Sequence, residues 1–285
     1  MADSEMKGWY FIIDVEKCEN CNNCFLACKD EHVGNEWTGY AAPQPDQGAG
    51  WMKITGKERG KFPLIDVAYL PMHCMHCDDA PCLRSAENGS VYKRPDGLVI
   101  IDAVRARGQR ELVKTCPYGL IRWNDHLSVP QKCTGCAHLI DEGWTKSRCI
   151  QSCPTGALSM RYLDGEAMKE IIRAEGLETY RSDLKTRPRV YYKNLYRFTR
   201  CFIAGSVAAQ KDGRDECVQG AEVVLSDSAG RFVATTSTDN YGDFKFDNLE
   251  EGSGIYRVSI RYAGHGQKLL EMRLEHSTDV GVVYV

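Results

Sequence analysis

The chain has 285 residues, and 36 basic and 39 acidic side chains give it a formal net charge of −3. This near balance provides no attraction towards nucleic acid or an anionic membrane surface. The longest apolar stretch, residues 201–209, is far shorter than the roughly 18–20 residues of a membrane-spanning helix. We therefore expect no nucleic-acid partner and no direct membrane insertion. Residues 1–8 are polar and lack the apolar core of an export signal, which predicts a cytoplasmic location.

The first predicted element is a short strand over residues 9–13 that leads into a run of cysteines. Cys18, Cys21, Cys24 and Cys28 have the spacing C-x2-C-x2-C-x3-C, which is typical of bacterial iron–sulfur proteins. Asp14 stands four residues before the first of these cysteines. Residues 31–71 follow as an insertion rich in Gly, Pro and Trp without a strong period, which predicts a loop available for contact with a partner.

The next two cysteine runs are incomplete. The second run contains Cys74, Cys77 and Cys82, and Ala86 occupies the place of a fourth cysteine. A predicted strand over residues 98–101 then leads to Asp102, which repeats the frame that begins at Asp14. In this third run, Cys116 is the one cysteine that remains, because the three earlier positions hold Ala106, Gln109 and Leu112.

The fourth run, formed by Cys133, Cys136, Cys149 and Cys153, is complete, and the four runs together indicate how they pair. In two-cluster ferredoxins the fourth cysteine of each run binds the cluster of the other run. Exchange between the first and fourth runs, and between the second and third, places every missing cysteine in one vacated site, whereas the other pairings leave incomplete sites. Site 1 is then Cys18, Cys21, Cys24 and Cys153; site 2 is Cys28, Cys133, Cys136 and Cys149; site 3 is Cys74, Cys77, Cys82 and Cys116; the vacated site is Ala86, Ala106, Gln109 and Leu112. Each complete set of four thiolates suits one [4Fe–4S] cluster, which gives three clusters.

Other uses of the cysteines are less favoured by the pattern. Structural zinc also uses C-x2-C pairs, but quartets that end in Cys-Pro are not its usual layout. A disulfide framework suits a short secreted chain rather than this one. His73 and His76 flank site 3 cysteines, and we expect them beside a cluster or towards solvent rather than as ligands. Cys201 and Cys217 lie outside the runs and are expected to be buried as small apolar residues, with a mutual disulfide as the alternative.

The pattern divides the chain into three parts. Residues 1–160 are expected to form tandem ferredoxin-like modules that carry every ligand. Residues 161–199 are expected to form a linker, with a helix over 164–176 that begins at Asp164, ends at Gly176 and has an apolar stripe through Met168. The aromatic and basic residues of 186–198 favour contact with a partner subunit over binding of single-stranded nucleic acid.

Residues 200–285 are expected to form an all-β sandwich, which makes the fold class α+β. Short strands separated by turn signals are predicted at 223–225, 232–234, 244–246, 256–260 and 280–284. The motif A-x-V-x-L followed by T-x-[ST]-x-D-x2-G-x-[FY]-x-F-x2-L, over residues 221–249, resembles carboxypeptidase-regulatory or collagen-adhesin B-type domains. No nucleophile and base are paired in this region, so we expect no catalysis there.

The cysteine architecture resembles the iron–sulfur subunits of the dimethyl-sulfoxide-reductase family, most of which carry four [4Fe–4S] clusters. Within that family it is most similar to the small subunits of pyrogallol–phloroglucinol transhydroxylases. The resemblance is carried by C-E-N-C-N-N-C-F-L-A-C at residues 18–28, by the degenerate third run that ends at 115–119, and by the segment 188–198 that leads into a terminal β-sandwich.

This resemblance implies a partner. A large subunit, in a heterodimer or a multiple of it, would bind molybdenum through two pyranopterin guanine dinucleotides and act on a polyphenol. The present chain would be the non-catalytic electron-transfer subunit, with no catalytic residue of its own. Iron–sulfur subunits of catechol dehydroxylases, resorcinol hydroxylases or other molybdenum reductases stay open as alternatives, and so does a purely structural role of the clusters.

Overall fold

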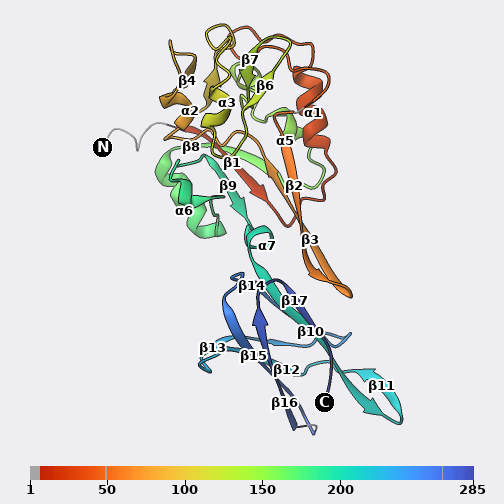
Figure 1. The fold of residues 1–285 in the computed structure, drawn as a ribbon. Helices are drawn as coiled ribbons and strands as arrows, with labels where there is room; N and C mark the ends of the chain where they lie inside the picture. Colours follow the sequence, from red (N-terminus) through yellow and green to blue (C-terminus); the bar gives the residue numbers. More distant parts are fainter. Residues whose placement is uncertain (1–6, 49, 265) are drawn as a thin grey trace. The chain divides into compact units, whose positions relative to one another are not determined.

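The computed structural model describes residues 7–48, 50–264 and 266–285, so most of the polar start of the chain, residues 1–6, lies outside the described residues. The chain forms two compact units (Figure 1). The cluster unit comprises Met1–Thr55 and Tyr69–Leu195, and the β unit comprises Gly56–Ala68 and Tyr196–Val285. Among the helices that the structure describes, none is long and apolar enough to cross a membrane.

A three-stranded sheet lies at the centre of the cluster unit. Its order is β8 (Leu158–Leu163), β1 (Gly8–Asp14) and β9 (Val190–Lys193), with β1 antiparallel to β8 and parallel to β9. Every residue of β1 is buried, so both faces of this strand are covered. The helix α6 (Gly165–Glu175) covers one face through an apolar cluster that includes Tyr10, Ile12 and Met168. The predicted strand over residues 9–13 is confirmed as β1.

The helix α6 begins and ends as its sequence predicts. The side chain of Asp164 accepts a hydrogen bond from the backbone N–H of Ala167 at 2.8 Å, which satisfies one of the free donors of the first turn. Gly176 ends the helix with a φ of 61°, a left-handed conformation that glycine adopts without steric cost. The apolar stripe is directed to the sheet, with Met168 fully buried.

The rest of the cluster unit consists of short elements that present cysteines. The helices are α1 (Asn23–His32), α2 (Pro81–Arg84), α3 (Leu112–Thr115), α4 (Ala137–Asp141), α5 (Arg148–Gln151) and the 3-10 turn η1 (Ser182–Leu184). Two antiparallel ladders pair β4 (Val91–Lys93) with β5 (Val99–Ile101), and β6 (Arg122–Asn124) with β7 (Val129–Gln131). The strand predicted over residues 98–101 is confirmed as β5.

The insertion over residues 31–71 is not only a loop. Its second half contains β2 (Lys53–Lys61), which pairs with β3 (Leu64–Met72). The loop prediction failed there because β2 is rich in charged residues and has no alternation of apolar and polar residues. Its one buried residue is the charged Arg59. The outer part of this hairpin, residues 56–68, belongs to the β unit.

The β unit is built from two four-stranded sheets. One contains β10 (Cys201–Lys211), β11 (Arg214–Cys217), β14 (Asp243–Leu249) and β17 (Thr278–Tyr284), and the other contains β12 (Glu222–Asp227), β13 (Phe232–Ser237), β15 (Gly254–Tyr262) and β16 (Gly266–Leu274). A short helix, α7 (Tyr196–Thr199), precedes β10. Residues from both sheets share one apolar core, as in a β-sandwich. All five predicted strands are confirmed, and the apolar stretch 201–209 proves to be the central strand β10.

A buried cluster of charges fixes the outer hairpin within the β unit. The Arg59 guanidinium, whose side chain has no exposed surface, forms ion pairs with Asp66 at 3.2 Å and with Asp247. It also lies over the Phe202 ring, with its Cζ 5.1 Å from the ring centroid. Lys245 contacts the same two carboxylates at 3.3 and 3.1 Å, so each negative charge has more than one cationic partner.

Candidate metal centres

The structure gathers the cysteines of site 2 and those of site 3 around two separate cavities. All four cysteines of site 2 line one cavity, together with His32, His73, Trp51 and other residues. All four cysteines of site 3 line the other, together with Lys132, Tyr118 and apolar side chains. Cysteines that are distant in the sequence therefore meet: Cys28 joins the fourth run, and Cys116 joins the second run.

The cysteines of site 1 also lie near one another, but closer to solvent. Burial raises the pKa of the Cys18 thiol, and the neighbouring thiols of Cys153 and Cys21 raise it further. Burial likewise raises the pKa of Cys24 to about 11, again with contributions from the thiols of this group. Cys21 is exposed, whereas Cys24 is buried.

Two helices explain why ligands cross between the first and fourth runs. Cys24 and Cys28 are one turn apart on α1, so one thiol belongs to site 1 and the next to site 2. The helix α5, which packs against α1, places Cys149 in site 2 and ends just before Cys153 of site 1. The two sites are therefore joined through this helix pair.

Burial raises the pKa of all four thiols of site 2 and of three thiols of site 3, those of Cys77, Cys82 and Cys116. Burial raises the pKa of Cys28, Cys133 and Cys149 to about 12. It raises the pKa of Cys77 to about 12 and that of Cys82 to about 11. Four such groups around one cavity are costly to ionise, because each thiolate is desolvated and repels the others. A bound metal centre would supply the missing positive charge, so this donor set fits iron–sulfur ligation.

Hydrogen-bond donors already point at several of the sulfur atoms. In site 2 the Gly135 N–H donates to Cys133 Sγ at 3.3 Å and the Gln44 Nε2 to Cys28 Sγ at 3.5 Å. In site 3 the His76 N–H donates to Cys74 Sγ at 3.4 Å and the Leu120 N–H to Cys116 Sγ at 3.4 Å. Such donors stabilise negative charge on sulfur and tune the potential of an iron–sulfur centre.

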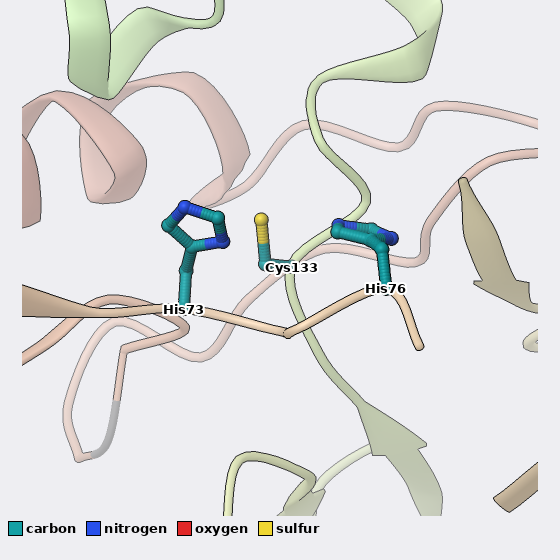
Figure 2. Close-up of side chains that lie close together, drawn as sticks. All are labelled: His73, His76 and Cys133. Carbon is teal, nitrogen blue, oxygen red and sulfur yellow. The ribbon is translucent and has the colours of Figure 1, made fainter. Parts of the chain in front are cut away.

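The two histidines beside site 3 are buried, so the solvent-facing alternative for them is wrong. One ring nitrogen of each of His73 and His76 lies within 4.8 Å of the other and of Cys133 Sγ, and Figure 2 shows the sulfur between the two rings. The Val99 N–H donates to His76 Nδ1 at 3.0 Å, so the neutral ring carries its proton on Nε2. A protonated Nε2 does not bind a metal, and these three residues are therefore not a separate metal site.

Lys132 is a buried cation that the sequence reasoning missed. Its ammonium donates to the carbonyl oxygens of Val99 and, at 3.3 Å, of Cys133. Burial lowers its pKa, but the nearby thiols of Cys74, Cys82 and Cys133 outweigh burial and raise it overall. Its position directly before a C-x2-C pair was no signal by itself, because Lys17 stands in the same place before Cys18 and is exposed.

The vacated positions are filled by protein. Ala106 and Leu112 have no exposed surface, and Ala86 is partly buried. The Gln109 Oε1 accepts a hydrogen bond from the Ser90 hydroxyl at 2.8 Å, and its Nε2 donates to the Arg105 carbonyl at 2.9 Å. Apolar packing and amide hydrogen bonds occupy the positions of the absent cysteines.

The degenerate third run nevertheless keeps the local geometry of the first. The Asp14 carboxylate accepts a hydrogen bond from the Glu16 N–H at 3.1 Å, two residues further along. The Asp102 carboxylate accepts the equivalent bond from the Val104 N–H at 2.9 Å. The same turn therefore opens both runs, although one has lost its cysteines.

The two cysteines outside the runs behave differently from each other. Both thiols are free, so the alternative of a mutual disulfide is wrong. Cys201 is buried in the core of the β unit, as expected. Cys217 is exposed at the end of β11, where the expectation of burial fails because that short edge strand is exposed throughout.

Comparison with known proteins finds a matching domain family for part of each unit. Residues 65–163 match the 4Fe-4S dicluster domain family, and residues 203–283 match the carboxypeptidase regulatory-like domain family. The pyrogallol hydroxytransferase small subunit of Pelobacter acidigallici is 44% identical over 98% of this chain and 99% of its own length. The iron–sulfur subunit of the arsenate respiratory reductase of Shewanella sp. (strain ANA-3) is 26% identical, over 64% of this chain and 94% of its own.

The B subunit of the anaerobic dimethyl sulfoxide reductase of Escherichia coli (strain K12) is 32% identical, over 54% of this chain and 73% of its own. The resemblance proposed from the cysteine runs is thus confirmed along nearly the whole chain. The chain therefore belongs to the family of 4Fe–4S electron-transfer subunits that includes the pyrogallol hydroxytransferase small subunit and the iron–sulfur subunits of dimethyl sulfoxide and arsenate reductases.

Proposed function

We propose that sites 1, 2 and 3 each hold one [4Fe–4S] cluster and that the chain is the electron-transfer subunit of a molybdenum hydroxytransferase acting on polyphenols. The observation that carries this proposal is the meeting of four cysteines from two different runs around each of two cavities. The 44% identity to a pyrogallol hydroxytransferase small subunit supports the substrate class. When bound, the clusters supply one-electron carriers whose potentials depend on nearby charge, hydrogen bonds and exposure.

The three sites follow one another in the order 1, 2, 3. Cys24 of site 1 is close enough to raise the pKa of Cys28 and Cys149, both of site 2, although burial is the main cause. Cys74 of site 3 likewise adds to the raised pKa of Cys133 of site 2. Site 2 is therefore the middle member of the proposed electron path, and the exposed Cys21 lies at its site 1 end.

The vacated site belongs beyond site 3, because α2 with Cys82 contacts α3, which begins at Leu112 and ends just before Cys116. We propose that the electron path is shortened at this end and that the subunit does not pass electrons to a membrane-anchored quinone site. A membrane subunit that co-purifies in equal amount would contradict this part of the proposal. The proposed tandem ferredoxin-like modules, over residues 1–160, are supported by the repeated Asp-led turns.

The proposed partner is a large subunit that binds molybdenum through two pyranopterin guanine dinucleotides, in the cytoplasm. The experiment is purification of the native complex without oxygen, followed by mass identification of the partner and molybdenum analysis. One molybdenum per large subunit and conversion of pyrogallol without net electron uptake are expected. A molybdenum partner that consumes reductant with catechol would instead identify a dehydroxylase, and a partner without molybdenum would contradict the proposal.

A further inference from the structure

Two polar residues, Lys132 and His76, each lie close to cysteines of both site 2 and site 3. Lys132 lines the site 3 cavity, and the residue that follows it, Cys133, is a site 2 cysteine. His76 follows Cys74 of site 3 by two residues, and its ring lies beside Cys133 of site 2 (Figure 2). This region, Lys132 with His76, is called the intersite bridge below.

The charge of Lys132 has no carboxylate to balance it. Lys132 is 3% exposed, and among the residues that the structure describes no Asp or Glu forms an ion pair with it. Two backbone carbonyls accept its hydrogen bonds, and the Cys74, Cys82 and Cys133 sulfurs are the acidic groups that it faces. Burial of an ammonium without a counter-ion is costly, so its compensation must come from the negative charge of the two cysteine sites.

The His76 ring, which lies beside Cys133, carries a hydrogen-bond donor without a partner among the described residues. Its Nδ1 already accepts the Val99 N–H, so the proton is on Nε2. This buried Nε2 has no hydrogen-bond partner in the described part of the chain. A buried N–H without a partner is costly, which makes an acceptor that binds later the natural explanation. The Cys133 sulfur, a site 2 ligand, lies beside the ring, so sulfur atoms of a cluster at site 2 are the acceptors that would come within its reach (Figure 2).

We propose that the intersite bridge sets the reduction potentials of the clusters at sites 2 and 3. The Lys132 ammonium raises both potentials, because it stabilises the electron added to either cluster. The His76 Nε2–H raises the potential at site 2 alone, because a cluster bound there would bring sulfur acceptors to this free donor. The inference rests on the proposed function in that it requires clusters at both sites. The bridge keeps sites 2 and 3, the inner part of the electron path, readily reducible although both sites are buried.

The test is an anaerobic redox titration followed by electron paramagnetic resonance, on the full chain in its native complex. Lys132→Met removes the charge and is expected to lower two of the three midpoint potentials. His76→Phe is expected to lower one of those same two. For each affected cluster the one-electron reduction equilibrium is expected to fall at least tenfold, which is about 59 mV. The third potential, that of site 1, stays unchanged.

Two further variants separate the charge from the shape of the side chain. Lys132→Arg keeps the charge and is expected to retain all three potentials. Lys93→Met removes a matched lysine whose Nζ donates to the Cys77 carbonyl at 3.0 Å but is already paired with Asp78, so a much smaller shift is expected. If Lys132→Met fails to assemble clusters, Lys132→Gln provides the same comparison.

The outcomes distinguish the inference from the proposed function. Three unchanged potentials in a Lys132→Met protein with full iron content contradict the inference and leave the proposed function intact. An equal shift of all three potentials, or a Lys93→Met shift as large as that of Lys132→Met, also contradicts it. An unmodified protein that holds fewer than three clusters contradicts the proposed function itself, whatever the variants do.

Discussion

The cluster unit and the β unit fill their interiors in different ways. In the β unit, side chains of two sheets meet in a continuous apolar core that contains Val223, Leu225, Val258 and Ile260, all without exposed surface. In the cluster unit, buried cysteines face cavities, and most elements around them are three to five residues long. Side-chain packing alone is enough to hold the first arrangement, because its strands and core are extensive. The second arrangement places ionisable thiols where a packed domain would place apolar groups, so its stability depends on what those thiols bind.

Removal of iron is the strongest way to test this difference. Chelation of iron from the oxidised protein is expected to unfold the cysteine-bearing segments 18–28, 74–82 and 133–153, because metal-binding free energy serves as folding free energy there. The strands β10 and β12 are expected to stay folded. Hydrogen exchange followed by mass spectrometry measures both units in the same sample. Retained protection of the cysteine-bearing segments after complete iron loss would show that the cluster unit folds without metal.

A smaller, local effect is expected from Arg59→Met in the β unit. The change leaves Asp66 and Asp247 without their fully buried partner, so unfolding of the β unit should become easier by about 3 kcal/mol, with Lys245 limiting the loss. Lys57→Met is the matched control, because the Lys57–Glu251 pair at 3.6 Å is partly exposed and should contribute less than about 1 kcal/mol. Denaturant unfolding measures both variants, and iron content should not change. Equal effects of the two substitutions would mean that burial of Arg59 is unimportant.

The smallest expected effect is a dependence of β-unit stability on acid pH. Burial alone would raise the pKa of Asp66, but Lys245 and Arg197 outweigh it and hold the pKa below its ordinary value of 3.8. A carboxylate with a lowered folded-state pKa stabilises the fold above its unfolded pKa, and this contribution is lost as the pH falls through the folded value. Wild type should therefore lose on the order of 1 kcal/mol of β-unit stability below about pH 4, relative to Asp66→Asn.

Exchange protection of the β unit, measured from pH 6 down to pH 2 for both proteins, tests this expectation. The stability difference between wild type and Asp66→Asn should be largest near neutral pH and should shrink in acid. A difference that is constant over the whole range would mean that the Asp66 charge does not contribute.

Cysteine spacing was the most informative part of the sequence. The vacancies at Ala86, Ala106, Gln109 and Leu112 pointed to one pairing of the runs, and the structure groups the remaining cysteines in the same sets around the site 2 and site 3 cavities. Ligand positions are predictable because a cluster demands four thiolates at fixed spacing. The helix α6 was predictable for a similar local reason, since its cap, stripe and stop lie within thirteen residues.

The features that escaped prediction depend on long-range contacts. The strand β2 is charged and has no apolar alternation. Its buried Arg59 is paired with Asp247, which is almost 190 residues further along the chain, so no local pattern could reveal this contact. The strand β10 is apolar without alternation, because consecutive residues are buried and both of its faces are therefore covered. Lys132 looks like an ordinary polar residue of a cysteine loop, and its burial between two sites appears only after the loops come together.

Iron content of the anaerobically purified complex, per copy of this chain, tests the central claim most directly. Three [4Fe–4S] clusters predict about 12 iron atoms per chain once the iron of the identified partner is subtracted. About 16 atoms would show that the positions of Ala86, Ala106, Gln109 and Leu112 do not mark an empty site. Zinc in place of iron would contradict the electron-transfer role altogether.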